Sequence, residues 1–353
     1  MSPRIPRRLR IGALEKGGIS ALLRSLAKLC AFVLANRFSL LCIACAFACG
    51  EPGGAFPGAT AAAGFDGARA FADLEALVRI GPRPAGSPGA ARARVLIRER
   101  LRQAGWVVEE HAFDARSPAA ESVSMVNLIA RREGTSPERV LLISHYDTKN
   151  IPGIAFVGAN DGASGTAVLL ELARVLAAEK LPLTTELVFA DGEEAFGPSI
   201  TESDGLYGSS ALAERMERDG SLAQLRSVIL VDMVGDRDLN LVVDLRSSPL
   251  LRELFAREAQ KLGQGGLVDE TARMGVIDDH SPFASRGVEH VLALIDFQFG
   301  ARVSPGPLWH SAGDDLDAVS AASLNSIGLV LVETVRAIEA HWQGAALPRA
   351  QGN

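Results

Sequence analysis

The chain has 353 residues, of which 48% are hydrophobic and 22% charged, enough for one large domain with a substantial core or two modest ones. The net charge of −6 is unevenly spread: residues 1–48 hold eight basic side chains and one acidic one, against 28 basic and 41 acidic ones in the rest. Because no basic stripe remains in the larger part, its composition argues against nucleic acid as a partner.

The N-terminal region has the features of an export signal. All four cysteines lie in the first 49 residues, and Phe38–Ala48 is an apolar run of 11 residues. Such a run is too short to span a bilayer and suits the core of a signal peptide. Residues 46–48 form an A-x-A cleavage pattern, and Cys49 resembles a lipoprotein acceptor.

We therefore expect 1–48 to be a signal peptide or membrane-targeting segment. The protein would be exported as a periplasmic or cell-envelope lipoprotein or in secreted form, with membrane contact only through this segment or a lipid on Cys49. The alternatives are a membrane anchor and a true start further downstream.

Four segments are predicted along the chain. Residues 49–64 are small and almost uncharged, as in a flexible linker; 65–342 form one folded domain, and 343–353 a tail. Within the domain, apolar periodicity predicts six helices, at 66–80, 90–104, 164–179, 206–217, 249–262 and 320–341. It predicts seven strands, at 106–113, 125–130, 140–145, 186–190, 228–234, 239–244 and 291–295. This alternation indicates a single α/β domain whose mostly parallel central sheet has helices on both faces.

Two adjacent carboxylates follow one of these strands. The run Leu187–Ala190 ends at Asp191-Gly192, and Glu193 and Glu194 come next. In open α/β sheets, ligands bind at this end of the strands. Neighbouring anions raise each other's pKa unless they share a cation. A metal held by one glutamate, with the other free to carry a proton, resolves the repulsion, and a solvated turn is the simpler alternative.

Other predicted strand ends carry similar groups. His145 and Asp147 follow one strand, and because residues two apart share a face, Asp147 can orient the imidazole. Asp161 precedes a predicted helix, and Asp232 ends another strand. Histidine and carboxylate ligands without cysteine suit a zinc ion that keeps one position open for substrate.

Six blocks of residues together match a known sequence pattern. They are His145-Tyr146-Asp147-Thr148-Lys149, residues 156–161 (FVGAND), 191–196 (DGEEAF) and 206–209 (LYGS), Asp278-Asp279-His280 with Pro282-Phe283, and Trp309-His310. In this order they resemble the zinc aminopeptidase superfamily, which also contains the glutaminyl-peptide cyclotransferases. The two aspartates before the histidine in the fifth block are similar to the cyclotransferase branch, since the aminopeptidase branch typically has one.

The resemblance implies a set of site residues. One catalytic zinc would have three ligands: Asp161, Glu194 and His310. Glu193 would be the general acid and base, with Asp232 and Asp278 hydrogen-bonding around the reacting amide. Two-zinc peptidases would place a second ion on His145 and Asp232, bridged by Asp161, so one zinc is expected and two are possible. Trp309 would form a wall of the substrate pocket. His280 would contact the site residues without binding the metal itself, unless residues 278–279 only cap a helix.

The implied activity is cyclisation of an N-terminal glutamine of a peptide or protein to pyroglutamate, with release of ammonia. A zinc aminopeptidase is the alternative, and an exported binding protein is a third. The chain departs from the animal cyclotransferases where a pocket tryptophan is expected after Glu194 and where a histidine is expected at or near Ala293, with His290 close by. The sequence predicts no oligomeric state.

Overall fold

A computed structural model describes residues 64–345 of the chain. The predicted signal segment 1–48, nearly all of the linker and residues 346–353 lie outside the described residues. Within them, strands and helices alternate as the sequence predicts.

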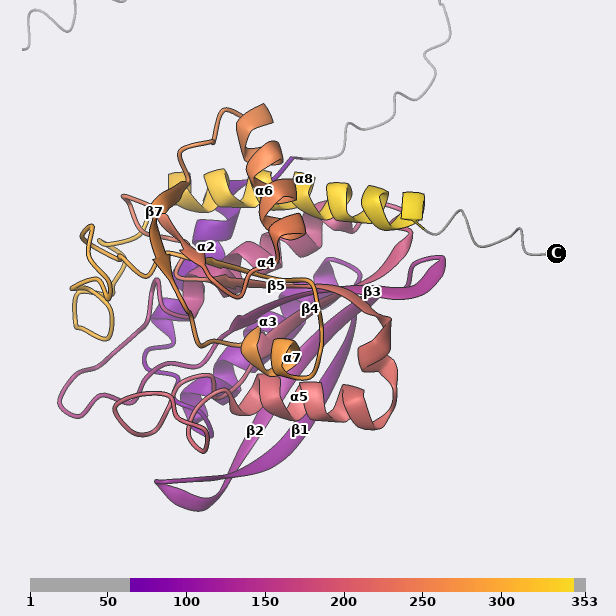
Figure 1. The fold of residues 1–353 in the computed structure, drawn as a ribbon. Coiled ribbons are helices and arrows are strands. Elements are labelled where there is room, and N and C mark those ends of the chain that lie inside the picture. The colour runs from indigo at the N-terminus through magenta and orange to yellow at the C-terminus, as the bar shows by residue number, and fades with distance from the viewer. Residues whose placement is uncertain (1–63, 346–353) are drawn as a thin grey trace, which may run out of the picture. The chain divides into compact units, whose positions relative to one another are not determined.

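A twisted sheet of six strands forms the centre (Figure 1), in the order β1-β2-β4-β3-β5-β8. Strands β4, β3, β5 and the edge strand β8 pair in parallel, whereas β1 and β2 form an antiparallel hairpin that joins antiparallel to β4. A separate pair, β6 and β7, is parallel. The strands are β1 Val107–Ser117, β2 Ala120–Arg132, β3 Ser136–His145, β4 Leu183–Ala190, β5 Leu225–Asp232, β6 Leu241–Asp244, β7 Val268–Met274 and β8 Val291–Ile295.

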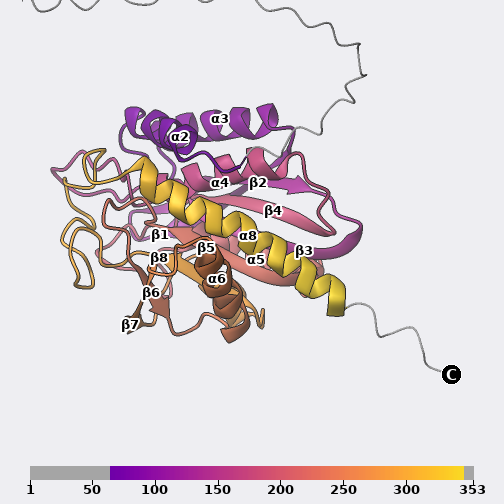
Figure 2. The ribbon, with the colours of Figure 1, turned by 90° about the horizontal axis from the view of Figure 1, so that it is seen from above.

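Helices cover both faces of this sheet (Figures 1 and 2), which confirms the predicted α/β class. On one face lie α3, α4, α6 and α8, with α2 packed on α4 and α8, and on the other face lie α5 and α7. The helices are α2 Gly67–Arg79, α3 Pro88–Gln103, α4 Ala163–Leu176, α5 Tyr207–Arg218, α6 Pro249–Lys261, α7 Ser281–Ser285 and α8 Ala321–Ala345, with a short 3₁₀ turn, η1, at Ser221–Gln224.

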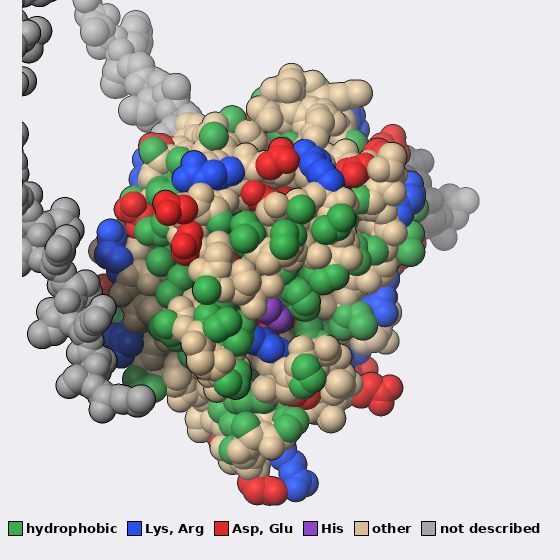
Figure 3. Space-filling model, turned by 90° about the vertical axis from the view of Figure 1, so that its left-hand side faces the viewer, with side chains coloured by type: hydrophobic (Ala, Val, Ile, Leu, Met, Phe, Trp, Pro, Cys, Tyr) green, Lys and Arg blue, Asp and Glu red, His purple; other side chains and the backbone are tan. Residues whose placement is uncertain are grey.

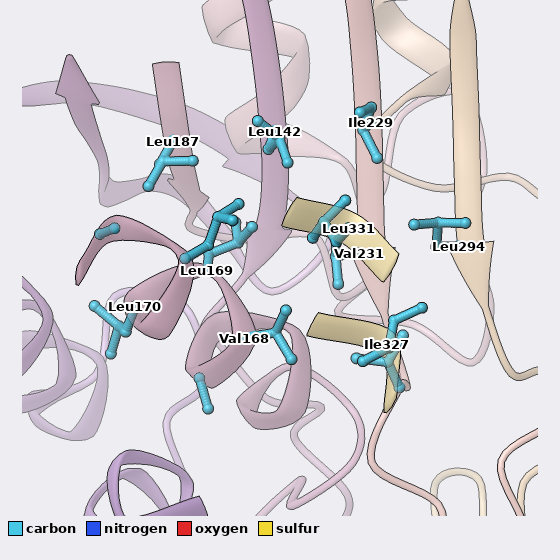
Figure 4. Close-up of a cluster of buried hydrophobic side chains, with 14 of the residues drawn as sticks. Leu142, Val168, Leu169, Leu170, Leu187, Ile229, Val231, Leu294, Ile327 and Leu331 are labelled. Atoms are coloured by element: carbon cyan, nitrogen blue, oxygen red, sulfur yellow. The ribbon is translucent and has the colours of Figure 1, made fainter. Parts of the chain in front are cut away.

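The larger core lies between the sheet and helices α4 and α8 (Figure 4). Leu142, Leu187 and Ile229 extend from three parallel strands toward Leu169 of α4 and Leu331 of α8. Alternate residues of the same strands, such as Leu141 and Val188, pack on the opposite face. Because both faces are buried, these strands read as continuous apolar runs in the sequence.

Helix α8 is long and apolar enough over 321–343 to cross a membrane by length and composition. Yet 56% of its apolar window is buried inside the protein, where it contacts α2, α4 and α6. Among the described helices it is the one that passes this test, and its burial is that of a core helix.

Candidate active site

The predicted site residues lie where the parallel strands end. His145 ends β3, Asp232 ends β5, and Glu193 follows β4 by three residues. Since β3 lies between β4 and β5, the register of the sheet brings these three residues to one edge. Figure 3 shows that face of the molecule, where hydrophobic side chains surround a hollow in which a histidine is visible.

Asp161, Glu194 and His310 form the first of two groups that could hold a metal ion. The His310 Nε2 atom lies 3.3 Å from Asp161 Oδ2 and 3.3 Å from Glu194 Oε2. Asp161 Oδ2 is buried and has no hydrogen-bond donor in the described residues. The three ligand atoms converge from three separate loops, as in a site that is shaped for a cation.

The second group shares Asp161 with the first. The Nε2 atom of His145 lies 3.2 Å from Asp161 Oδ1 and 3.3 Å from Asp232 Oδ1, and these three side chains could also hold a metal ion. The Nδ1 atom of His145 faces Asp147 Oδ1 at 3.4 Å. The predicted ligands of one and of two ions are therefore all brought together.

Asp147 also fixes the two glutamates. Its carboxylate accepts hydrogen bonds from the backbone amides of Glu193, at 3.1 Å, and Glu194, at 3.3 Å. The backbone amide of Lys149 in turn donates to Glu194 Oε1 at 3.1 Å. These bonds orient the chain after β4, so that the adjacent carboxylates have different surroundings: Glu194 belongs to the first metal group and Glu193 does not.

Asp314 holds the loop that carries Asp161. It is buried and accepts hydrogen bonds from the backbone amides of Asn160, at 2.6 Å, and Asp161, at 3.0 Å. Gly162 follows with φ of 89°, and a Cβ there would lie 2.8 Å from the Asp147 carbonyl oxygen and 2.9 Å from the His145 ring. Only glycine fits this close approach between the Asp161 loop and β3.

Strained backbone conformations also gather at the site. The non-glycine residues with positive φ in the described chain are Leu206, Met233 and His310, with φ between 46° and 53°. Met233 follows Asp232, His310 is itself in the first metal group, and the Leu206 amide donates to the Glu193 carbonyl at 2.8 Å. Such conformations cost free energy and cluster at functional sites.

Burial and crowding shift the proton affinities of the acids. Desolvation, followed by the charges of Asp278, Glu194 and Asp279, raises the pKa of Glu193 well above its usual range. Desolvation and the charges of Asp232 and Asp279 do the same for Asp278. The pKa of Asp161 falls despite its burial, because the imidazoles of His145 and His310 lie 3.2 and 3.3 Å from its oxygens and favour the anion. Glu193 and Asp278 are thus suited to hold protons, and Asp161 to stay anionic.

A cavity of about 250 Å³ opens onto these side chains. Its polar end is formed by Asp161, Glu193, Glu194, Asp232, Asp278 and His310. Its apolar wall includes the predicted Trp309 and also Phe297, whose ring centroid lies 5.2 Å from that of Trp309. Pro198 and Ile200 line the cavity where the sequence lacks the expected tryptophan.

Phe297, Ile200 and Asp314 were not predicted as site residues. Phe297 could have been found, because it follows β8, the strand beside β5, and the ends of neighbouring parallel strands lie together. Asp314 lies four residues after His310 but has no sequence signal of its own. Ile200 belongs to an irregular loop, whose path the sequence pattern does not predict.

Two histidines belong to neither metal group. His280 Nε2 faces Asp244 Oδ2 at 3.5 Å and precedes α7, at whose start no side chain caps the helix. His290 precedes β8 at the opposite end from the site, with its ring 5.3 Å from that of Trp342. Since Ala293 occupies β8, that strand contributes no histidine to the cavity.

Comparisons with known proteins identify the family of the chain. The model of peptidase family M28 matches residues 127–335. The glutaminyl-peptide cyclotransferase of Bos taurus is 33% identical over 289 residues, which cover 70% of this chain and 76% of that one. The crystal structure of an Acidobacteriales bacterium glutaminyl cyclase, 36% identical, matches with a TM-score of 0.74 over 83% of this chain and 100% of that one.

A leucine aminopeptidase precursor from Bacteroides thetaiotaomicron shares the fold, with a TM-score of 0.68 at 24% identity over 78% of this chain and 98% of that one. The superfamily resemblance seen in the sequence blocks is confirmed. The chain belongs to peptidase family M28 and, within it, to the glutaminyl-peptide cyclotransferase family.

Proposed function

We propose that this enzyme is a zinc-dependent glutaminyl-peptide cyclotransferase, which converts an N-terminal glutamine of a peptide to pyroglutamate and releases ammonia. The relatives of that name support the reaction. The observation that carries the proposal is Glu193, a buried carboxylate that lines the cavity beside the first metal group but is not part of it. This is the place for a group that moves a proton.

The residues present fit a zinc ion. Asp161, Glu194 and His310 would hold it, and the unpartnered Asp161 Oδ2 atom is the kind of buried acceptor that a cation satisfies. When bound, zinc supplies a Lewis acid that polarises the γ-carbonyl of the glutamine. Carboxylate and imidazole ligands complete such a site without a cysteine thiolate, and residues 50–353 contain no cysteine.

Glu193 would act first as a base and then as an acid. It takes a proton from the α-amine as that nitrogen forms a bond to the γ-carbon of the same residue. It then gives the proton to the departing amide nitrogen, the carbon–nitrogen bond of the side chain breaks, and ammonia leaves. Its raised pKa, caused by burial and by Asp278, suits a group that both accepts and returns a proton.

Asp278 and Asp232 would hold the substrate's nitrogen atoms. Both line the cavity beside Glu193, and burial raises the pKa of each. Nucleophile and electrophile belong to one residue, so the protein mainly has to hold the glutamine in the ring-closing conformation. The apolar wall of Phe297 and Trp309 would exclude water from this pose.

The test is a mass spectrum of a peptide with N-terminal glutamine, recorded after incubation with the zinc-loaded enzyme. We expect the loss of one ammonia, and no reaction with Glu193→Gln at equal zinc content. Loss of the whole first residue would instead identify an aminopeptidase.

An aminopeptidase is the second candidate because the group His145, Asp161 and Asp232 could hold a second metal ion. In that reaction Glu193 would activate a water molecule instead of the substrate's own amine. Peptides with N-terminal leucine or alanine separate the two activities, since neither can cyclise. Release of free leucine or alanine would favour the peptidase.

We also propose that the protein is exported and that Cys49 carries a lipid. The A-x-A pattern and the apolar run before Cys49 support this. Membrane fractions of cells that express the full chain should contain the enzyme, and Cys49→Ser should move it to the soluble fraction. An unchanged distribution would argue against lipidation.

A further inference from the structure

Arg83 is a fully buried cation in the turn between α2 and α3. Buried arginines are usually paired with a carboxylate. The hydrogen bonds that the guanidinium makes within the described residues all go to backbone carbonyl oxygens instead. This unusual partner set calls for a role beyond an ion pair.

Three of these carbonyls lie outside both α2 and the turn. Arg83 Nε donates to the Tyr146 carbonyl at 3.0 Å, Nη1 to that of Val157 at 2.8 Å, and Nη2 to that of Gly158 at 3.2 Å. Nη1 also reaches the carbonyls of Leu77 in α2 and of Gly81 in its own turn. The planar guanidinium therefore ties two distant loops to the end of α2 with fixed geometry.

Both loops carry residues of the metal site. Tyr146 stands between His145 and Asp147, and Gly158 is three residues before Asp161. Backbone bonds reinforce the link, because the Arg83 amide donates to Thr148 Oγ1 at 2.9 Å and the Thr148 amide donates to the Arg83 carbonyl at 3.2 Å. A shift of this side chain would move the two loops relative to each other.

The charge of Arg83 has an opposite effect on a bound metal. Burial lowers the pKa of the guanidinium to about 10, and the charges of Asp314, Asp147 and Asp161 oppose this, so it remains a cation at neutral pH. A cation near the site repels zinc, whereas correct placement of the ligands favours it. The two effects can be separated by experiment, since lysine keeps the positive charge but lacks the branched guanidinium that bonds to several carbonyls at once.

We propose that Arg83 is a positioning residue of the metal centre: by bonding to the carbonyls of Tyr146, Val157 and Gly158, it places the Asp161 loop against the end of β3 and thereby raises the affinity for zinc. The inference concerns the metal site alone. Because it is tested by zinc affinity and not by activity, the inference on Arg83 can fail while the proposed cyclisation stands, and the cyclisation can fail while the inference stands.

The test compares Arg83→Lys and Arg83→Gln in the full chain. The zinc dissociation constant is measured by competition with a chromogenic chelator, and the unfolding transition of each metal-free protein in urea shows that it is folded. We expect both variants to bind zinc about tenfold more weakly, as when groups that orient metal ligands are removed. Co²⁺ in place of zinc should show a changed visible spectrum in both.

Arg139→Gln is the matched control. Arg139 lies near the start of β3, far along the strand from His145, and its Nη1 atom is 2.8 Å from the buried Glu186 carboxylate. It should lose stability and keep the wild-type zinc affinity and Co²⁺ spectrum. If the Arg83 variants behave in the same way, the residue is only structural and the proposal is wrong.

Two other results bear on the proposal. Tighter zinc binding by Arg83→Gln, with Arg83→Lys unchanged, would show that the charge acts and the placement does not, and would overturn it. Should neither variant fold, Thr148→Val, which removes one bond of the same link, decides: weaker zinc binding by a smaller factor supports the proposal, and unchanged affinity overturns it.

Discussion

Asp161 is the residue on which the two metal groups meet. One of its oxygens faces His310 and the other faces His145, at 3.3 and 3.2 Å. Two ions bound together would therefore share Asp161. A single ion in the first group would leave His145 and Asp232, the other members of the second group, without a metal. Asp232 then separates a one-metal from a two-metal centre, because it belongs to the second group and not to the first.

We expect Asp232→Asn to keep one zinc ion per chain and to lower kcat about 100-fold or more, because the lost carboxylate holds the substrate's nitrogen atoms while Glu193 transfers the proton. Metal analysis by mass spectrometry and steady-state rates on a glutamine peptide measure this. A fall from two ions to one, with activity lost in parallel, would point to a two-metal peptidase centre.

Phe297 forms part of the apolar wall of the cavity. Its ring packs on Trp309 with an interplanar angle of 60°, and the Trp309 ring stacks on His310 at 3.9 Å. Phe297→Ala should raise KM for glutamine peptides about 3- to 10-fold, the value of one aromatic contact, with zinc content unchanged. Phe113→Ala, on β1, is the control, and equal KM values for both variants would remove Phe297 from substrate binding.

Residue types at the site could be read from the sequence pattern, but their division of labour followed only from the family resemblance. The strand ends predict that Glu193, Glu194 and Asp232 lie together, because parallel neighbours end at one edge. Which glutamate faces His310 depends on the bonds from their amides to Asp147, and these are tertiary contacts. Arg83 gives no signal at all, since nothing in Gly-Pro-Arg-Pro marks a buried side chain.

At the scale of elements, the loop between β4 and α5 replaces the expected tryptophan with a short aliphatic wall. Asp204 organises this loop: it is buried, and its carboxylate accepts hydrogen bonds from the amides of Phe196 and Gly197 and from the Tyr207 hydroxyl, at 2.8, 2.7 and 2.8 Å. The position of Ile200 in the cavity thus depends on one carboxylate outside it.

Asp204→Ala should lower the free energy of unfolding by about 2 kcal/mol, since it leaves two partly buried amides without an acceptor. It should also raise KM, while zinc affinity stays constant because no metal ligand moves. Urea unfolding, steady-state kinetics and chelator competition measure the three quantities. Tyr207→Phe, which removes one of the three bonds, should have smaller effects of the same sign, and a change in zinc affinity would contradict the assignment.

The elements themselves were predicted unevenly, for physical reasons. The buried strand Val291–Ile295 is found with its predicted bounds, because an apolar run between turns is unambiguous. The strand Val268–Met274 was missed: it is half exposed and rich in polar residues, and only its pairing with β6 makes it a strand. Strands β1 and β2 extend beyond the predicted bounds. At their hairpin end apolar and polar residues alternate only weakly, because that end lies in solvent.

Across the whole molecule, buried acids far from the site set a pH dependence of stability. Glu339 of α8 is 3% exposed, and its carboxylate accepts a hydrogen bond from the Leu183 amide, at the start of β4. Burial raises its pKa to about 7, partly offset by that bond. In the unfolded chain a glutamate has a pKa of about 4.3.

Between these two pKa values the folded protein holds a proton that the unfolded chain has released. The stabilisation from a neutral Glu339 is therefore complete below about pH 4.3 and is lost as the pH rises through about 7. Glu339→Gln keeps a neutral acceptor for Leu183 at every pH. The free energy of unfolding of Glu339→Gln, minus that of wild type, should therefore rise by on the order of 2 kcal/mol as the pH increases from about 4 to about 8.

Urea unfolding of both metal-free proteins across this range gives the difference, in which the shared pH dependence of the metal site cancels. Glu333→Gln on the same helix, whose carboxylate is more exposed and pairs with Arg336, is the control and should run parallel to wild type. Parallel curves for Glu339→Gln as well would show that Glu339 is ionised in the folded protein. Because Glu339 contacts β4 at the end away from Glu193, activity on glutamine peptides should stay at the wild-type level in either case.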